Sequence, residues 1–97
     1  MQRNERPYAL SIAGFDPSGG AGFLADAKAM EAQGVYALTV ATAITVQHES
    51  VFQGVEWLKV DLIKQQIKLL FQKYPVSFCK IGLIESCLLY TSPSPRD

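Results

Sequence analysis

Residues 14–22, GFDPSGGAG, combine residue types that allow a backbone to come close to a ligand. Four glycines, a proline and a serine lie between an apolar run, YALSIAG, and a segment of good helix formers. Glycine permits close approaches that other residues forbid, and the first N–H groups of a helix attract polar and anionic groups. This order of strand, glycine loop and helix predicts a turn that could bind a ligand.

Three interpretations of the loop follow from the residues alone. A phosphate-binding loop of the GxxxxGK[ST] type is excluded, because no lysine follows Gly19 to reach the phosphates. A dinucleotide-binding GxGxx[GA] turn fits residues 20–25, but its glycines should follow the strand directly, and five residues separate Gly14 from Gly20. Such a turn also needs an acidic residue about 20 positions further on, and the nearest candidate, Glu49, comes late. The third interpretation is a glycine-rich connection that binds nothing.

The segments around the loop alternate between strand and helix patterns. Residues 35–46 are rich in β-branched and small residues with almost no charge, which is typical of a strand covered on both faces. A helix over 59–74 is indicated by an apolar stripe of Val60, Ile63, Ile67, Leu70 and Tyr74. The expected strands are 8–13, 35–46, 51–57 and 77–84, and the expected helices are 20–33, with Gly34 as C-cap, and 59–74. This alternation predicts an α/β fold with a largely parallel sheet.

The composition describes one small globular domain. The chain has 97 residues, 48% of them hydrophobic, and a formal net charge of 0, which gives no basic surface for nucleic acid. No apolar run approaches the roughly 20 residues of a membrane span, and no signal peptide is recognisable, so we expect no membrane partner and a cytoplasmic location. Cys79 and Cys87 form no metal-binding spacing with His48, and we expect Cys79 in the core.

Residues 87–97, CLLYTSPSPRD, depart from the alternation. An α/β chain should begin a helix here, and Ser86 could cap one, but two prolines and two serines in the last six residues exclude it. The string resembles the translation of a sequencing adapter. We therefore expect residues 87–97 to be a non-native tail and the natural protein to continue past Ser86.

The string ALSIAGFDPSGGAGFLADAKAMEAQGVYALTVATAITVQ, with the later CKIGL, resembles the N-terminal half of the hydroxymethylpyrimidine/phosphomethylpyrimidine kinases. The resemblance covers residues 8–86, and its motif AGxDPSGGAGxxAD is specific. Phe15, His48 and Leu83 depart from the residues most common in that family. The resemblance implies that residues 1–86 are the N-terminal part of a single kinase domain with a partial ribokinase-like three-layer fold.

The family resemblance implies a substrate, 4-amino-5-hydroxymethyl-2-methylpyrimidine or its monophosphate, and a role for Gln47. A carboxamide offers an acceptor and a donor that complement the amine and ring nitrogen of an aminopyrimidine. Gln47 lies at the carboxyl end of a predicted central strand, where ligands bind in parallel sheets. We therefore expect Gln47 to bind the substrate, whereas His48 is interpreted as a polar loop residue.

The other expected substrate-binding residues supply backbone, pocket wall or carboxylates. They are Gly14, Asp16, Gly20, Ala21, Gly22, Asp26, Gly82 and Leu83. Two roles stay open for each carboxylate: Asp16 could cap loop N–H groups or contact substrate, and Asp26 could bind substrate or favour the helix dipole. The role of Lys80 stays open; one interpretation is that it buries its stem and extends its charge into water.

The resemblance implies ATP and Mg²⁺ as cofactors, with their sites mainly in a C-terminal glycine motif that does not occur here. We therefore expect no catalytic residue and no metal ligand in this chain, which should be inactive alone. The full-length enzyme is expected to act on a small molecule and to form a homodimer. The alternatives are a pyridoxal-type vitamin kinase of the same superfamily, a dinucleotide-binding oxidoreductase and a non-catalytic pyrimidine-binding module.

Overall fold

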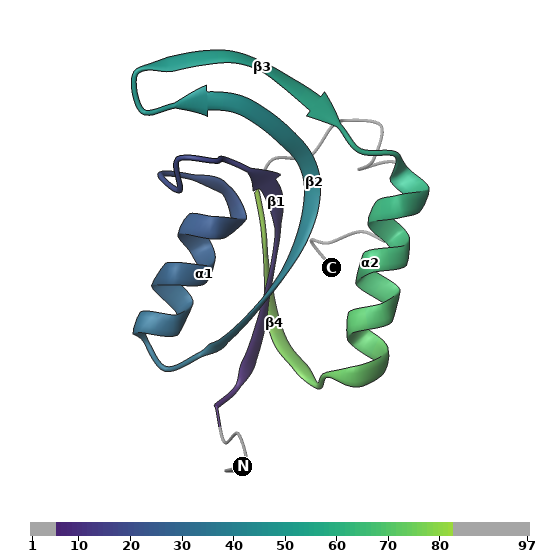
Figure 1. Cartoon of the computed structure of the whole chain (residues 1–97). Coiled ribbons are helices and arrows are strands. Elements are labelled where there is room, and N and C mark those ends of the chain that lie inside the picture. The colour runs from purple at the N-terminus through teal and green to yellow at the C-terminus, as the bar shows by residue number, and fades with distance from the viewer. Residues whose placement is uncertain (1–5, 83–97) are drawn as a thin grey trace.

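The computed structural model describes residues 6–82, which form one sheet and two helices (Figure 1). The strands are β1 (Tyr8–Phe15), β2 (Tyr36–His48), β3 (Val51–Trp57) and β4 (Val76–Ile81), and the helices are α1 (Gly22–Ala32) and α2 (Val60–Lys73). The predicted order of elements is confirmed. The expected end of the last strand, at residue 84, and the tail at 87–97 lie outside the described residues.

The sheet has the strand order β3-β2-β1-β4, with β1 parallel to both of its neighbours. Among the strand pairs of residues 6–82, only the β2–β3 hairpin is antiparallel. Helices α1 and α2 lie on opposite sides of the sheet, which makes three layers (Figure 1). The predicted α/β architecture with a mostly parallel sheet is therefore confirmed.

The main hydrophobic core lies between the sheet and α2. Alternate residues of a strand point to opposite faces, so Leu10 and Ile12 of β1 point to the same face as Leu38 and Val40 of β2. These four residues form a buried cluster with Ile63 of α2. The other predicted members of the α2 stripe, Val60, Ile67, Leu70 and Tyr74, pack against this cluster, which confirms the stripe.

Gln66 of α2 completes the edge of β2 at a point that β3 does not cover. Its carboxamide accepts a hydrogen bond from the Ala41 N–H at 3.1 Å and donates one to the Ala41 carbonyl at 3.0 Å. The pairing of β2 with β3 begins only at Ala43. One side chain therefore satisfies both backbone polar groups of Ala41, which has no strand partner on this side.

Helix α1 begins at Gly22, two residues later than predicted, and is ended by Gly34 as predicted. Gly34 has a φ of +81°, which favours glycine. Its N–H donates to the Glu31 carbonyl at 3.1 Å, and the Val35 N–H donates to the Met30 carbonyl at 2.9 Å. These two bonds form a Schellman motif, which satisfies carbonyls at the end of the helix.

Strand β4 forms an open edge of the sheet, and this position makes one sequence expectation wrong. Cys79 was expected in the core but is exposed, because no further element of residues 6–82 covers this strand. Partial burial still raises the pKa of its thiol.

Neither α1 nor α2 is long and apolar enough to cross a membrane.

Candidate functional site

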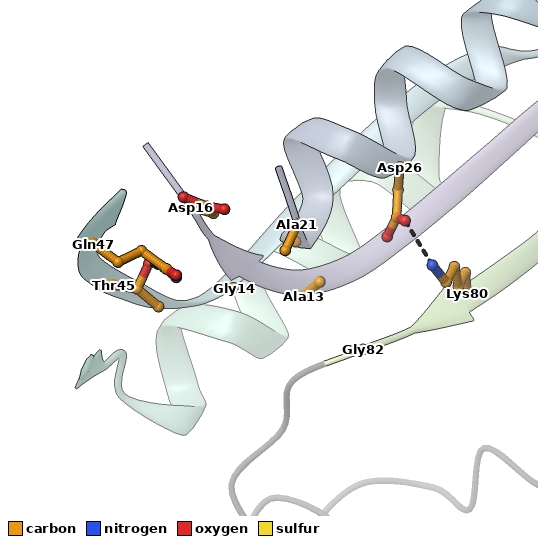
Figure 2. Close-up of a pocket in the computed structure, with 10 residues that line it drawn as sticks. Ala13, Gly14, Asp16, Ala21, Asp26, Thr45, Gln47, Lys80 and Gly82 are labelled. Carbon is orange, nitrogen blue, oxygen red and sulfur yellow. Dashed lines mark hydrogen bonds and ion pairs between the residues drawn. The ribbon is translucent and has the colours of Figure 1, made fainter. Parts of the chain in front are cut away.

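A cavity of about 180 Å³ lies at the carboxyl ends of β1, β2 and β4, beside the glycine loop and the start of α1 (Figure 2). Most of the residues predicted for the site line it, namely Gly14, Asp16, Ala21, Gly22, Asp26, Gln47 and Gly82. Gly20 is not among the lining residues, and Leu83 lies outside the described residues. Three lining residues were not proposed from the sequence as site residues: Ala13, Thr45 and Lys80.

Asp16 holds the glycine loop from inside. Its Oδ1 accepts hydrogen bonds from the Ser18 N–H at 2.9 Å and from the Ser18 hydroxyl at 2.8 Å. The Ser18 hydroxyl is the main cause of a pKa below the ordinary value, and the backbone N–H groups of Ser18, Ala21 and Gly20 also stabilise the charged form. Of the two roles considered for Asp16, the observed contacts are those of a loop cap.

This arrangement argues against a dinucleotide turn. In such a turn, the loop N–H groups and the helix N-terminus bind a pyrophosphate. Here the N–H groups of Gly20 and Ala21 stabilise the carboxylate of Asp16, which is buried. A negative charge of the chain itself therefore occupies the position that a phosphate would need.

Gly22 must be glycine because the loop folds back onto the end of β1. Its φ is +70°, and a Cβ atom there would lie 2.2 Å from the carbonyl oxygen of Gly14. Phe15 and Gly22 also form a short antiparallel bridge. The close approach that the glycines were expected to offer a ligand is made, at Gly22, to the protein's own strand.

Asp26 binds two side chains rather than serving only the helix dipole. Its Oδ2 accepts a hydrogen bond from the hydroxyl of Ser11 on β1 at 2.8 Å, and its Oδ1 forms a 2.6 Å ion pair with Lys80 on β4 (Figure 2). Burial raises the pKa of Asp26, but the hydrogen bonds from Lys80 and Ser11 outweigh it and lower the pKa below its ordinary value.

This cluster changes the interpretation of Lys80. The sequence suggested that its charge simply reaches water, whereas the ammonium group crosses from β4 to the carboxylate of α1. Asp26 stays charged at the wall of the cavity, and the pair links the helix to the edge strand. Next to it, the Gly82 N–H donates to the Ile12 carbonyl at 2.8 Å and holds the chain after β4 against β1.

Gln47 and Thr45 lie side by side on β2 at the opposite wall of the cavity (Figure 2). The Gln47 Nε2 donates a hydrogen bond to the Thr45 Oγ1 at 2.7 Å, and the Thr45 hydroxyl donates to the Phe15 carbonyl at 2.8 Å. Gln47 is half-buried at the carboxyl end of its strand, as predicted. The exposed His48 accepts the Ser50 N–H at 3.1 Å, which fits a loop role.

No three His, Cys, Asp or Glu side chains within residues 6–82 lie close enough together to bind a metal ion. The groups that line the cavity can make polar contacts with a ligand. One wall offers the carboxamide of Gln47, the other offers the charged pair of Asp26 and Lys80, and the loop between them offers backbone.

A family model described as phosphomethylpyrimidine kinase matches residues 16–91, most of the chain. The chain belongs to the phosphomethylpyrimidine kinase family. The hydroxymethylpyrimidine/phosphomethylpyrimidine kinase of Aquifex aeolicus is 42% identical over 76 residues, which cover 78% of this chain and 30% of that protein. The enzyme of the same name from Escherichia coli is 39% identical over 80 residues, which cover 82% of this chain and 30% of that protein. The resemblance inferred from the motif is thus confirmed.

Two solved structures are similar in fold to this chain. The phosphomethylpyrimidine kinase of Clostridium difficile matches with a TM-score of 0.79 and 42% identity, over 82% of this chain and 35% of that one. The pyridoxal kinase of Bacillus subtilis, solved as an ADP complex, matches with a TM-score of 0.80 and 29% identity, over 89% of this chain and 34% of that one. The sheet and helices of this chain are therefore part of a ribokinase-like fold, as predicted.

The chain spans less than a third of the length of these curated kinases. The matching part contains the glycine loop and Gln47.

Proposed function

We propose that residues 6–82 form the pyrimidine-binding side of an ATP-dependent kinase of thiamine biosynthesis. The enzyme would phosphorylate 4-amino-5-hydroxymethyl-2-methylpyrimidine and its monophosphate. The observation that carries this proposal is the position of Gln47 in a chain of the phosphomethylpyrimidine kinase family: its carboxamide lines a cavity at the carboxyl ends of the strands, beside the glycine loop.

The cavity offers groups that can recognise a small polar ring. A carboxamide can accept from the amine of an aminopyrimidine and donate to the adjacent ring nitrogen. The cavity of about 180 Å³ is smaller than the roughly 300–1,000 Å³ of a typical small-molecule site. That volume fits one wall of a larger site, the rest of which would come from further chain.

ATP and Mg²⁺ belong to this proposal as the phosphoryl donor and its metal. Such kinases act mainly by positioning the reactants and by stabilising charge with Mg²⁺ on the phosphates. The residues described here would bind and orient the pyrimidine and keep it beside the glycine loop. We propose that this chain alone transfers no phosphoryl group, and we retain a homodimer and a cytoplasmic location as expectations for the full-length enzyme.

A pyridoxal-type kinase is the second candidate, because the fold alone does not separate the two. The TM-scores are 0.79 against the phosphomethylpyrimidine kinase and 0.80 against the pyridoxal kinase. Sequence identity, at 42% against 29%, favours the pyrimidine substrate.

The test compares the two substrates in the complete kinase that carries residues 6–82. ATP-dependent product formation is followed with the hydroxymethylpyrimidine, with its monophosphate and with pyridoxal, each over a range of concentrations. We expect kcat/KM for the pyrimidine to exceed that for pyridoxal by at least about tenfold. A preference for pyridoxal would replace the proposal by its alternative, and no ATP-dependent turnover of either would refute both.

A further inference from the structure

We propose that Thr45 is a positioning residue that fixes the orientation of the Gln47 amide and so selects which ligand edge the cavity accepts. The edge selected is an amine donor beside a ring-nitrogen acceptor. The edge rejected has the opposite order, a carbonyl acceptor beside a ring N–H donor. This inference rests on the proposed role of Gln47 in binding the pyrimidine.

The proton of the Thr45 hydroxyl is already used within the protein. A threonine hydroxyl has one proton to donate and lone pairs that accept. The Thr45 hydroxyl lies 2.8 Å from the Phe15 carbonyl oxygen, which can only accept, so its proton is used there. Toward Gln47, at 2.7 Å, the Thr45 oxygen presents only lone pairs.

The Thr45 oxygen determines which end of the Gln47 amide faces it. An acceptor at 2.7 Å requires the NH₂ end of the carboxamide, because the oxygen end would place two lone-pair-bearing atoms in contact. The amide therefore cannot rotate by 180° without losing a hydrogen bond. Its Oε1 and one remaining Nε2 proton are left for a ligand, which fixes their order as acceptor and donor.

Thr45 is itself held in place by its surroundings. Thr45 is only 6% exposed, and residues 45 and 47 point to the same face of β2 because strands alternate. Its hydroxyl reaches the last residue of β1, near the shift in register between these two strands. The amide of Gln47 is thus tied, through Thr45, to the backbone of the central strand.

The consequence is discrimination between two pyrimidines of nearly the same shape. A 4-aminopyrimidine finds the acceptor and the donor that it needs. Its 4-oxo analogue would place its carbonyl against the Gln47 Oε1 and its ring N–H against the Nε2 group. These clashes are relieved only if the Gln47 amide turns over and breaks its hydrogen bond to Thr45. Polar groups left unpaired in a sheltered site lower binding by about tenfold or more.

The test measures kcat/KM for the 4-amino substrate and its 4-oxo analogue in the complete kinase and in three variants. Thr45→Val keeps the branched shape and removes the hydroxyl, Thr45→Ser restores the hydroxyl, and Thr39→Val is the matched control on the same strand outside the cavity. We expect Thr45→Val to reduce the preference for the amino substrate at least about fivefold. Thr45→Ser and Thr39→Val should keep the preference within about twofold of the original value.

The preference is a ratio measured on one enzyme sample, so partial unfolding of a variant does not change it. A preference that Thr45→Val leaves within about twofold would overturn the inference, as would one that Thr45→Ser fails to restore. Gln47→Ala separates this failure from that of the proposed function. If Gln47→Ala lowers use of the pyrimidine while Thr45→Val leaves the preference intact, only the role of Thr45 is refuted; if Gln47→Ala changes nothing, the binding role of Gln47 is refuted as well.

Discussion

Gln47→Ala removes an acceptor and a donor from the wall of the cavity at once. We expect kcat/KM for the pyrimidine to fall at least about tenfold in the complete kinase, because each unpaired group in a sheltered site costs roughly 1–3 kcal/mol. The KM for ATP should change little. His48→Ala is the neighbouring control and should have a much smaller effect, since His48 is exposed and bonds only within its turn. Loss of turnover in His48→Ala with full activity in Gln47→Ala would reverse the assignment.

Gly22→Ala tests whether the glycine loop is constrained by the fold itself. The added Cβ would meet the Gly14 carbonyl oxygen at 2.2 Å, in addition to the strain of a φ of +70°. Gly34→Ala has a similar φ of +81° but open space around it, so it should show the backbone strain alone, about 1–2 kcal/mol. We expect urea unfolding to show a clearly larger loss of stability for Gly22→Ala. Equal losses would mean that the contact with Gly14 relaxes freely.

Lys80→Met should raise the pKa of Asp26, because it removes the hydrogen bond and the charge that lower it. A carboxylate whose pKa is lowered by folding stabilises the protein above its unfolded pKa, near 3.9, and loses this contribution as the pH falls through the folded pKa. The variant should therefore lose stability at a higher pH during acid titration. The effect on stability should stay below about 1 kcal/mol, since the Lys80 side chain is 60% exposed. Carboxyl NMR of Asp26 measures the shift, and Lys68→Met on α2 should leave it unchanged.

Gln66→Ala addresses the contact between α2 and the edge of β2. The variant leaves the N–H and carbonyl of Ala41 without their side-chain partner, which should lower the free energy of unfolding by roughly 1–3 kcal/mol. Gln65→Ala is the matched control on the same helix. Gln65 is exposed, so its replacement should stay within about 0.5 kcal/mol. Denaturant unfolding of the two variants side by side measures the difference, and equal stabilities would contradict the role of Gln66.

The elements could be predicted from local pattern because each carries its own signal. The stripe of α2 and the C-terminal Gly34 of α1 were readable over a few residues and are confirmed. The hydrogen bonds between Gln66 and Ala41 could not be predicted in this way, because the two residues are 25 positions apart and the pattern of α2 does not distinguish Gln66 from Gln65. Cys79 was misplaced because the apolar pattern of a strand does not say whether that strand lies at the centre or the edge of a sheet.

The site was predictable where a motif marked it and not where distant side chains meet. Gly14, Gly22 and Gln47 were named from the family resemblance, and they line one cavity. The link from Ser11 through Asp26 to Lys80 joins three elements and has no local signature. The hydroxyl of Thr45 was missed for a related reason: in a strand, threonine is equally well explained by its β-branched shape.

The whole molecule exposes apolar surface at both edges of its sheet. Phe78 of β4 is 50% exposed and Phe52 of β3 is 62% exposed, and an open strand edge favours association. We expect this chain to self-associate as its concentration rises, and Phe78→Lys to shift that association to higher concentration. Ser77→Lys, on the same strand, adds the same charge without removing apolar surface and should have a smaller effect. Sedimentation velocity measures both; a chain that stays monomeric throughout would contradict the expectation.

The central position of β1 has a consequence for the order in which the chain can fold. Its two partners are reached only through crossovers, and its pairing with β4 joins Tyr8 to Val76. Contacts between residues so far apart in sequence form slowly, because the intervening loop must close first. The β2–β3 hairpin, with its short turn, is the local sheet contact available early. During synthesis β1 is made before β4, so the backbone edge of β1 that pairs with β4 stays open to other partners until Val76–Ile81 has left the ribosome.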